Sequence, residues 1–383
     1  MVSRTYLDHA STTPARPEAV AAWQRWVGLP QADPARLHEE GRLVRGALEE
    51  AREQVALLVG ALPREVVFTS GATEAINAAV WGATRRQAGA PVLFANVEHS
   101  AVRDASVRSG PSEVIAVNET ARVDLDALAE RLASKTLPRP GLVHCQWANH
   151  EVGTLQPVQE VVDLCRSAGV TVHVDAAAAC GHVPMNLDEL GADLVSISAH
   201  KLGGFPGAGA LVIRRGSRIE PFIVGGEQER ARRAGLEAMP ALLAFGAAAG
   251  VLGAYGQDAL REEAKAARRL IAAVAQVAGT VDQVTVVGPA AATERLPHLI
   301  CLGVGGVEAE PVLIGLDRAG VAVHSGSACA SESIEPSPVL EAMGVDSSHS
   351  LRVSVGWTTT DADIEAFRRA FGEVVAALRA LRA

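Results

Sequence analysis

The chain has 383 residues, enough for two domains and a large buried core, and 48% of them are hydrophobic. It carries 35 Lys and Arg against 44 Asp and Glu, and the resulting net charge of −9 argues against a protein that binds nucleic acid or anionic membranes directly. The uncharged stretch 238–255 is too weakly apolar for a membrane span, and the N-terminus lacks the apolar core of a signal peptide, so we expect a cytoplasmic protein.

Seven short runs rich in Val and Ile lie between residues 60 and 215. Their continuous apolarity is typical of strands that are covered on both faces. Helical segments at 73–88, 124–134 and 157–168 lie between them and can form crossovers. The pattern predicts an α/β fold with a mostly parallel seven-stranded sheet, whose strands are 66–68, 92–94, 114–115, 142–144, 170–174, 194–197 and 210–213.

The second half of the chain begins with an Ala-rich helix over 238–255 and a charged helix near 257–278. The pattern that follows is typical of a smaller α/β domain, with strands 283–287, 299–304, 321–324 and 350–355 and helices 308–319 and from 361. We therefore expect a large domain formed by 15–256 and a small domain formed by 1–14 and 257–383. The cleft between two such domains is the usual place for an active site.

Lysine occurs only three times in a chain whose other basic residues are arginines, so a lysine can mark a position whose chemistry arginine cannot supply. Lys135 lies in a turn and Lys265 in a charged run, and both are typical of a solvated surface. Lys201 follows the predicted strand 194–197 and precedes a Gly-rich turn, where desolvation would suit it to Schiff-base chemistry. The alternative is that Lys201 is an ordinary surface lysine. This alternative is less favoured because arginine is the usual basic surface residue in this chain.

Ligands of open α/β sheets bind at the carboxyl ends of the strands. After the first predicted strand, the turn 69–74 offers backbone amides and the Thr73 hydroxyl to a phosphate, with an ordinary helix cap as the alternative. Asp175 ends a buried strand, where a carboxylate needs a cationic or hydrogen-bonding partner. Together with Lys201, these groups match pyridoxal phosphate, which needs an imine-forming lysine, a phosphate anchor and a carboxylate beside its pyridine nitrogen.

Three further side chains carry candidate chemistry. His99 follows strand 92–94 and is placed to cover a cofactor ring or move protons, although a lone histidine is more often structural. Arg352 can hold a substrate carboxylate, with a structural ion pair as the alternative. Cys329 lies among small polar residues, where a thiol is a liability unless it acts as a nucleophile. The other cysteines lack zinc or disulfide spacing and resemble buried hydrophobic residues: Cys145, Cys165, Cys180 and Cys301.

Seven motifs from one end of the chain to the other form a specific set: 6–14, 69–74, 98–99, 174–176, 198–201, 325–329 and 351–352. With them, the chain resembles the cysteine desulfurases, in the class V aminotransferase branch of fold-type-I pyridoxal-phosphate enzymes. The Ser-Gly-Ser-Ala-Cys loop, followed by Glu335, Pro336 and Ser337, is similar to the housekeeping and nitrogen-fixation subgroup.

The resemblance implies a role for each candidate residue. Lys201 would carry the cofactor and remove the Cα proton of L-cysteine, while His99 would stack on the ring and assist proton transfer. Cys329 would attack the substrate sulfur, keep it as a persulfide for an acceptor protein and release alanine. The resemblance assigns substrate binding to Arg352 and Asn149, and further contacts with the cofactor to Asp175, Ala72, Thr73, Ser198, His200 and His150.

The chain departs from the family pattern in and around the site. His150 stands where an asparagine amide usually faces the phenolic oxygen of the cofactor, and Ala178 replaces a glutamine that hydrogen-bonds the same oxygen. Leu236 replaces a threonine that reaches the phosphate of the partner subunit, and the glycine turn 203–207 is also altered. Each lost hydrogen bond costs on the order of 1 kcal/mol, so we expect weaker cofactor binding or a shifted imine pKa with the core machinery retained.

Other functions remain open from the sequence. The same scaffold could serve as a selenocysteine lyase, a cysteine sulfinate desulfinase or an aminotransferase, and a degenerate scaffold subunit is a further alternative. The family implies a homodimer. The final sulfur acceptor is not identified, because iron-sulfur assembly, tRNA thiolation and DNA sulfur modification are all compatible, and we expect no direct contact with nucleic acid.

Overall fold

The computed structural model describes residues 4–28, 31–325 and 336–381, so the predicted nucleophile Cys329 lies outside the described residues. The strands are β1 Thr5–Tyr6, β2 Val66–Thr69, β3 Val92–Ala95, β4 Ser112–Ile115, β5 Leu142–Gln146, β6 Thr171–Asp175, β7 Leu194–Ser198, β8 Gly209–Ile213, β9 Val284–Val287, β10 Leu299–Val304, β11 Val321–Ala322 and β12 Ser350–Ser354. The α-helices are α1 Pro17–Val27, α2 Glu39–Val59, α3 Ala72–Thr84, α4 Ser100–Ser109, α5 Leu125–Ala133, α6 Val158–Ala168, α7 Leu187–Leu190, α8 Gln228–Ala231, α9 Met239–Ala278, α10 Ala309–Arg318, α11 Pro338–Ala342 and α12 Asp361–Ala380.

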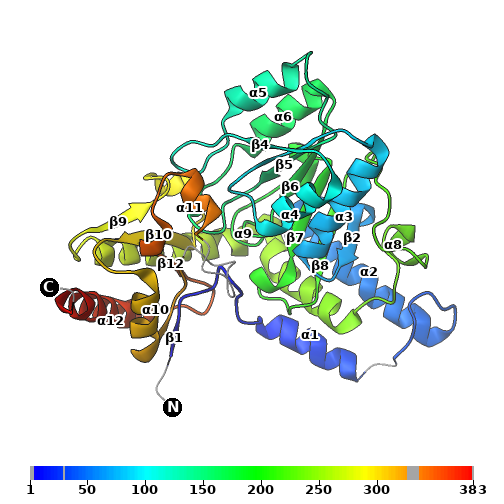
Figure 1. The fold of residues 1–383 in the computed structure, drawn as a ribbon. Helices are drawn as coiled ribbons and strands as arrows, with labels where there is room; N and C mark the ends of the chain where they lie inside the picture. The colour runs from blue at the N-terminus through cyan, green and yellow to red at the C-terminus, as the bar shows by residue number, and fades with distance from the viewer. Residues whose placement is uncertain (1–3, 29–30, 326–335, 382–383) are drawn as a thin grey trace.

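The seven apolar runs form one sheet, as predicted, in the order β2-β8-β7-β6-β5-β3-β4 (Figure 1). Strand β8 is antiparallel to both β2 and β7, and the other neighbouring strands of the sheet are parallel. The carboxyl ends of β2, β3, β6 and β7 therefore meet at the same edge of the sheet. The prediction of a mostly parallel α/β sheet is confirmed.

Helices cover both faces of this sheet, which explains why its strands are continuously apolar. In β2, Val67 packs with Ile76 and Val80 of α3 on one face, whereas Phe68 packs on the other face in the core that includes Phe245 of α9. Successive side chains of a strand point to opposite faces, so a strand covered twice needs apolar residues at every position.

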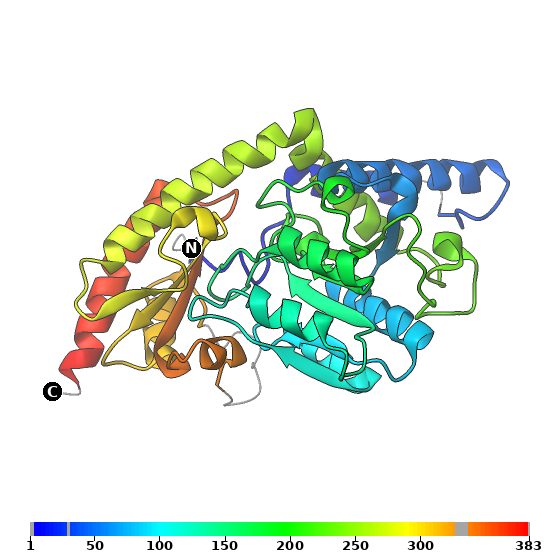
Figure 2. The same cartoon turned by 90° about the horizontal axis from the view of Figure 1, so that it is seen from above.

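The second half of the chain forms an antiparallel sheet in the order β12-β10-β9 and pairs β1 with β11. Helices α9, α10 and α12 pack around these strands over a core that includes Phe367 and Phe371 (Figure 2). The elements expected after residue 280 are confirmed. The proposed boundaries of the two domains, 15–256 against 1–14 with 257–383, stay a prediction.

Helix α9 combines the Ala-rich and charged helices that the sequence separates. Its halves, Met239–Ala254 and Gly256–Ala278, meet at a bend of 88°. At the bend, Gln257 has a positive φ of 69°, and its side-chain amide donates to the carbonyl oxygens of Leu58 and Met185. Within the described residues, no single helix has the length and apolar character of a membrane span; only the two halves of α9 taken together reach them, by length and composition alone.

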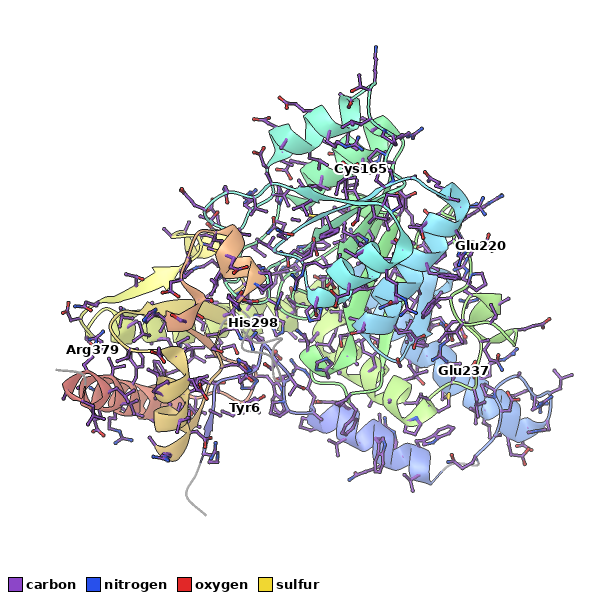
Figure 3. The ribbon with its side chains drawn as sticks, in the orientation of Figure 1. Tyr6, Cys165, Glu220, Glu237, His298 and Arg379 are labelled. Atoms are coloured by element: carbon purple, nitrogen blue, oxygen red, sulfur yellow. The ribbon has the colours of Figure 1, made fainter. Side chains whose placement is uncertain are left out.

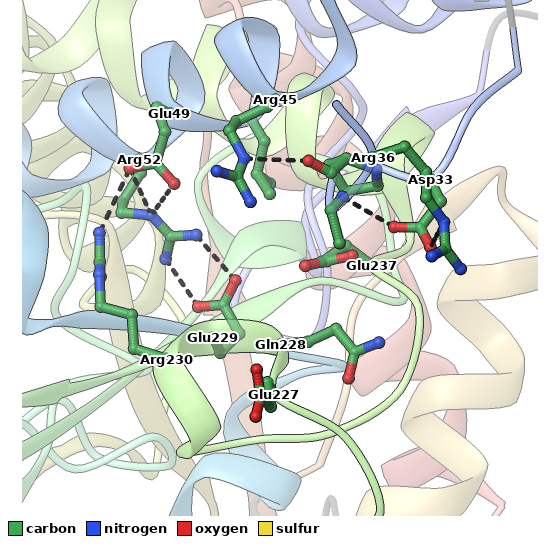
Figure 4. Close-up of a pocket in the computed structure, with 13 residues that line it drawn as sticks. Asp33, Arg36, Arg45, Glu49, Arg52, Glu227, Gln228, Glu229, Arg230 and Glu237 are labelled. Carbon is green, nitrogen blue, oxygen red and sulfur yellow. Dashed lines mark hydrogen bonds and ion pairs between the residues drawn. The ribbon is translucent and has the colours of Figure 1, made fainter. Parts of the chain in front are cut away.

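A buried ion pair ties α2 to α8 and β2 beside a charged cavity of about 640 Å³ (Figure 4). Arg52 Nη1 lies 2.6 Å from Glu229 Oε2, and both side chains are only 2% exposed. Glu229 also accepts from the Phe68 amide at 2.8 Å, and Arg52 donates to the Val66 carbonyl at 2.9 Å. The φ of Glu229 is +48°, an unfavourable conformation that these contacts hold in place.

We expect the substitution Glu229→Ala to lower the free energy of unfolding by about 3–5 kcal/mol, because it removes the buried partner of Arg52 and leaves this charge only the more exposed carboxylate of Glu49. Urea unfolding followed by circular dichroism measures this change. The control is Glu365→Ala, which removes an exposed pair with Arg368 and should leave the unfolding midpoint unchanged. Equal midpoints for both variants would contradict the structural role of the Arg52 pair.

Candidate active site

A cavity of about 480 Å³ opens at the carboxyl ends of β2, β6 and β7. The structure brings nine of the sequence-predicted residues to its wall: Ala72, Thr73, His99, His150, Asp175, Ser198, His200, Lys201 and Arg352. Ala178, one of the departures from the family pattern, also lines it. Asn149 does not line the cavity, and Cys329 lies outside the described residues.

The turn before α3 has the geometry of an anion site. The first backbone amides of a helix have no hydrogen-bond partner within the helix. In α3, a helix of 13 residues, these amides belong to residues that line the cavity, where an anion can accept from them. A Cβ built on Gly71 would meet nothing within 4 Å, so open space lies over the turn. From below, Gly209 of β8 supports the turn so closely that a Cβ on Gly209 would lie 2.7 Å from the Gly71 backbone.

Asp175 is buried at the end of β6 and is held by two donors. The Ala177 amide and the Ser196 hydroxyl donate to its Oδ1 at 3.0 and 3.1 Å. Among the described residues, the side-chain hydrogen bonds of Asp175 all reach Oδ1, which leaves Oδ2 for a donor in the cavity. A protonated ring nitrogen is such a donor.

A second buried carboxyl group, that of Glu98, lies near Asp175. Its Oε1 accepts from the Gln146 amide at 2.6 Å, whereas Oε2 has no hydrogen-bond partner in the described part of the chain. Burial, and then the charge of Asp175, raise the pKa of Glu98 to about 8. Glu98 therefore holds its proton to a higher pH than an exposed carboxyl group, which limits the negative charge it adds beside Asp175.

His99 is both the N-cap of α4 and a wall of the cavity. Its Nδ1 accepts from the Ala101 amide at 3.1 Å, so the proton of the neutral ring is on Nε2. The ring meets that of His150 edge to face, with centroids 5.1 Å apart. Burial lowers the pKa of His99 below its usual 6.5, and burial together with the neighbouring His99 lowers the pKa of His150 still further. Both imidazoles are therefore neutral at physiological pH.

Lys201 ends a short 3-10 helix, Ala199–Lys201, directly after β7. It is partly buried, whereas Lys135 and Lys265 are exposed, as the sequence predicts. Its backbone carbonyl contacts Nε2 of His182 at 3.0 Å, and the His182 ring stacks on His298, which Figure 3 labels, at a centroid distance of 3.6 Å. These contacts fix the backbone that carries the lysine.

His200 and the N-terminal segment close the same side of the cavity. Burial, and then the charge of Lys201, lower the pKa of His200 to about 4, so the ring is neutral and can hydrogen-bond in either tautomer. Its Nδ1 lies 3.2 Å from the Thr12 hydroxyl, and its carbonyl accepts from the Thr13 amide at 3.1 Å. Ala10 and Ser11 of the same segment line the cavity.

Arg352 forms the structural ion pair that the sequence leaves open, and it does so at the wall of the cavity. It lies in β12 and is 2% exposed, and its Nη2 donates to Asp8 Oδ1 at 2.9 Å and to the Ser11 hydroxyl at 2.6 Å. Its Nη1 donates to the His150 carbonyl at 3.0 Å. Nε is buried and has no partner among the described residues. A structural ion pair thus holds the guanidinium at the cavity wall, and its binding of a substrate carboxylate stays a prediction.

Asn149 has a structural arrangement that the sequence does not predict. Its side chain is buried, donates to the Val97 carbonyl, and accepts from the amides of Glu151 and Val152. These bonds use its carbonyl oxygen and one amide hydrogen within the protein, so the direct binding of substrate by Asn149 stays a prediction. Leu236 is 64% exposed, and the four cysteines other than Cys329 are buried, as expected.

Three residues of this site were missed by sequence reasoning or left without a role. Glu98 stands beside His99 in a quoted motif, but only the folded chain brings it near Asp175. Ser196, which donates to Asp175, lies inside the apolar run 194–197, and Gly209, which supports the phosphate turn, directly precedes the run 210–213; neither run gave a chemical signal. A glycine at the start of a buried strand is the one hint of close backbone approach that the sequence offers.

The residues present fit pyridoxal phosphate. The open turn at Gly71 suits the phosphate, the second oxygen of Asp175 suits the pyridine nitrogen, and Lys201 lies on the same wall for the covalent link. Together with the seven-stranded sheet, this site defines a pyridoxal-phosphate-dependent enzyme of fold type I.

Comparison with known proteins assigns the family. Residues 5–367 match the aminotransferase class-V family, and the chain belongs to it. The chain is 37% identical to cysteine desulfurase IscS of Dictyoglomus turgidum over 95% of this chain and 92% of that protein. It is 33% identical to cysteine desulfurase IscS 1 of Archaeoglobus fulgidus over 98% of each. A solved NifS-like protein from Rickettsia africae, 29% identical, covers 97% of this chain and 99% of its own with a TM-score of 0.88.

We expect Gly209→Ala to weaken the binding of pyridoxal phosphate at least about tenfold. The added Cβ collides with the Gly71 backbone and shifts the amides of the phosphate turn, and 1.4 kcal/mol of lost hydrogen bonding is already tenfold. Titration of apo-protein with the cofactor, followed by visible absorbance, gives the dissociation constant. Gly46→Ala in α2, where a Cβ meets nothing within 4 Å, should leave it unchanged.

Proposed function

We propose that this protein is an L-cysteine desulfurase that converts L-cysteine to L-alanine and passes the sulfur to an acceptor protein. The observation that carries the proposal is the convergence of Lys201, Asp175 and Arg352 on one cavity, in a chain similar along its whole length to cysteine desulfurases. The cavity offers a covalent anchor, a partner for a protonated ring and a clamp for a carboxylate. An amino acid bound to pyridoxal phosphate needs these three groups.

The cofactor is held by residues from several strand ends. Ala72 and Thr73 would bind its phosphate together with Ser198 and His200, and Lys201 would form the imine. Asp175 would keep the pyridine nitrogen protonated. When bound, pyridoxal phosphate withdraws electrons from the substrate Cα and Cβ.

Other side chains at the cavity wall would bind the substrate and move protons. Arg352, already oriented by Asp8, would hold the substrate carboxylate, and the freed Lys201 amine would take the Cα proton. His99 keeps a proton on Nε2 because its Nδ1 is occupied by the Ala101 amide, so it is suited to donate from the ring face. His150 would face the phenolic oxygen in place of the usual amide.

Cys329 is the proposed nucleophile. Its thiolate attacks the sulfur of the bound cysteine, an S–S bond forms as the Cβ–S bond breaks, and the electron pair of the broken bond remains on the carbon side, where a proton completes the methyl group of alanine. The overall change, cysteine plus enzyme thiol giving alanine plus enzyme persulfide, needs no external oxidant. The persulfide then passes its outer sulfur to an acceptor thiol.

The setting of the reaction is also a proposal. A cytoplasmic homodimer, with one subunit completing the site of the other, accords with the family and with the exposed Leu236. The net charge of −9 favours a route in which a protein partner, not this chain, touches any nucleic acid.

Cys329→Ala should keep the visible absorbance of the bound cofactor but lose sulfide release and alanine formation from cysteine by at least about 100-fold, because the acceptor for sulfur is gone. Alanine and sulfide are measured with a thiol reductant present. Cys165→Ala, which removes a buried thiol of α6 instead, should retain activity. A transaminase or a sulfinate desulfinase would be indifferent to the loss of Cys329, and that outcome would contradict the proposal.

His99→Asn separates the two roles of His99. Asparagine keeps the N-cap of α4, so the fold should be retained, whereas loss of the ring should lower kcat by about 10²–10⁴-fold. Because burial lowers the pKa of His99 below 6.5, its neutral form persists from pH 8 to pH 7, and the wild-type rate should show no decline from His99 protonation in that interval. Steady-state rates across pH test both points, and an unchanged kcat in the variant would exclude His99 from proton transfer.

A further inference from the structure

The two ends of the segment that carries Cys329 are described, and both are tied to residues of the active site. Cys329 lies four positions after Ser325 and eight before Ser337 in the sequence. The contacts of these two described ends are therefore the part of this region that the structure shows.

The end that precedes Cys329 is held by the backbone of Arg352. The Arg352 amide donates to the His324 carbonyl at 2.6 Å, and the His324 amide donates back to the Arg352 carbonyl at 3.2 Å. The same arginine lines the cavity through its side chain. Ser325, the last described residue on this side, is buried.

The end that follows Cys329 is held by a buried carboxyl group. The Ser337 hydroxyl donates to Glu151 Oε2 at 2.5 Å and accepts from the Leu340 amide at 3.2 Å, so Ser337 caps α11 and binds Glu151 at once. Ser337 is 1% exposed and Glu151 3% exposed. In Figure 1, α11 lies at the side of the three-stranded sheet that faces the large sheet.

Glu151 also touches the cavity wall. It follows His150 in the chain, its Oε1 lies 3.6 Å from His150 Nε2, and Arg352 Nη1 donates to the His150 carbonyl at 3.0 Å. Burial raises the pKa of Glu151 to about 7, against the opposite effects of the Ser337 hydrogen bond and the charge of Arg352. Burying a carboxyl group costs free energy unless it is hydrogen-bonded. The hydrogen bond from Ser337 offsets part of this cost for Glu151.

We propose that Glu151 is a positioning residue for sulfur transfer: by holding Ser337, it anchors the chain eight positions after Cys329 beside His150, while the backbone of Arg352 anchors His324 before it. This inference rests on the proposed desulfurase function. It adds that the proposed clamp for the substrate carboxylate and the anchors of the nucleophile are one connected network. Glu151 itself touches neither substrate nor reacting sulfur in this proposal.

The proposal separates two steps of the reaction. Removal of the Cα proton depends on Lys201 and the cofactor, whereas transfer of sulfur depends on the placement of Cys329. Loss of the contact between Glu151 and Ser337 should slow the second step and spare the first. A residue that only stabilised the fold would affect both steps together.

The test compares Glu151→Leu with Glu151→Gln in the full-length holoenzyme. Leucine removes the acceptor for the Ser337 hydroxyl, while glutamine keeps it. Single-turnover persulfide formation on Cys329 is measured by alkylation and mass spectrometry, and exchange of the Cα hydrogen of L-alanine is measured in deuterated water. We expect E151L to slow persulfide formation at least tenfold and E151Q to stay within threefold of the wild type. Both variants should exchange the Cα hydrogen within twofold of the wild-type rate.

Ser337→Ala breaks the same hydrogen bond from the Ser337 side and leaves Glu151 in place. It therefore tests the contact even if E151L folds poorly. S337A should slow persulfide formation to a similar extent, and the double variant E151L/S337A should be no slower than the slower single variant, because the contact is already broken. Equal loss of exchange and persulfide formation in E151L, or an unchanged persulfide rate, would overturn the inference. A wild-type holoenzyme that forms no persulfide would instead overturn the proposed function itself.

Discussion

The shared direction of β2, β3, β6 and β7 is the constraint on which the active site depends. Parallel strands end at one edge of the sheet, so residues more than 100 positions apart in the sequence, such as Thr73 and Asp175, line the same cavity. The antiparallel strand β8 contributes no side chain at its own carboxyl end there. It begins at that edge, and its first residue, Gly209, is small enough to let the phosphate turn lie directly on it.

Three buried carboxyl groups lie around this edge, and they differ in the hydrogen-bond donors that contact them. This difference indicates which of them is suited to pair with a cation. Asp175 accepts from an amide and a hydroxyl and faces the cavity, so it is the group suited to pair with a cation. Glu98 lacks a partner at one oxygen and holds its proton to about pH 8. Glu151, with a pKa of about 7, is stabilised by the Ser337 hydroxyl. Burial thus limits the negative charge that Glu98 and Glu151 add around this edge of the sheet.

The sheet and the strand-end residues Thr73, Asp175 and Lys201 were predictable because their signals are local, whereas the resemblance to a family supplied four other residues of the cavity wall: Ala72, His150, Ser198 and His200. Continuous apolar runs fix the strands, and a residue that ends such a run lies at the edge of the sheet. Contacts across the fold leave no comparable signal. Ser337 and Glu151 are 186 positions apart, and Gln257, at the bend of α9, donates to the carbonyl oxygens of Leu58 and Met185, which are 199 and 72 positions away. The ambiguity of Arg352 between clamp and ion pair also needed the structure, because its partner Asp8 lies 344 positions away.

The departure at His150 is smaller in chemical terms than the change of residue type suggests. An asparagine amide has donors for a phenolic oxygen, and a neutral imidazole retains one. Burial and the neighbouring His99 keep His150 neutral, so it adds no second positive charge beside Lys201. Its ring is held edge to face against His99, and its carbonyl is held by Arg352, so the imidazole is fixed from two sides. Ala178, which also lines the cavity, has no side-chain donor at all, so of these two departures it is the one that leaves no donor at its position.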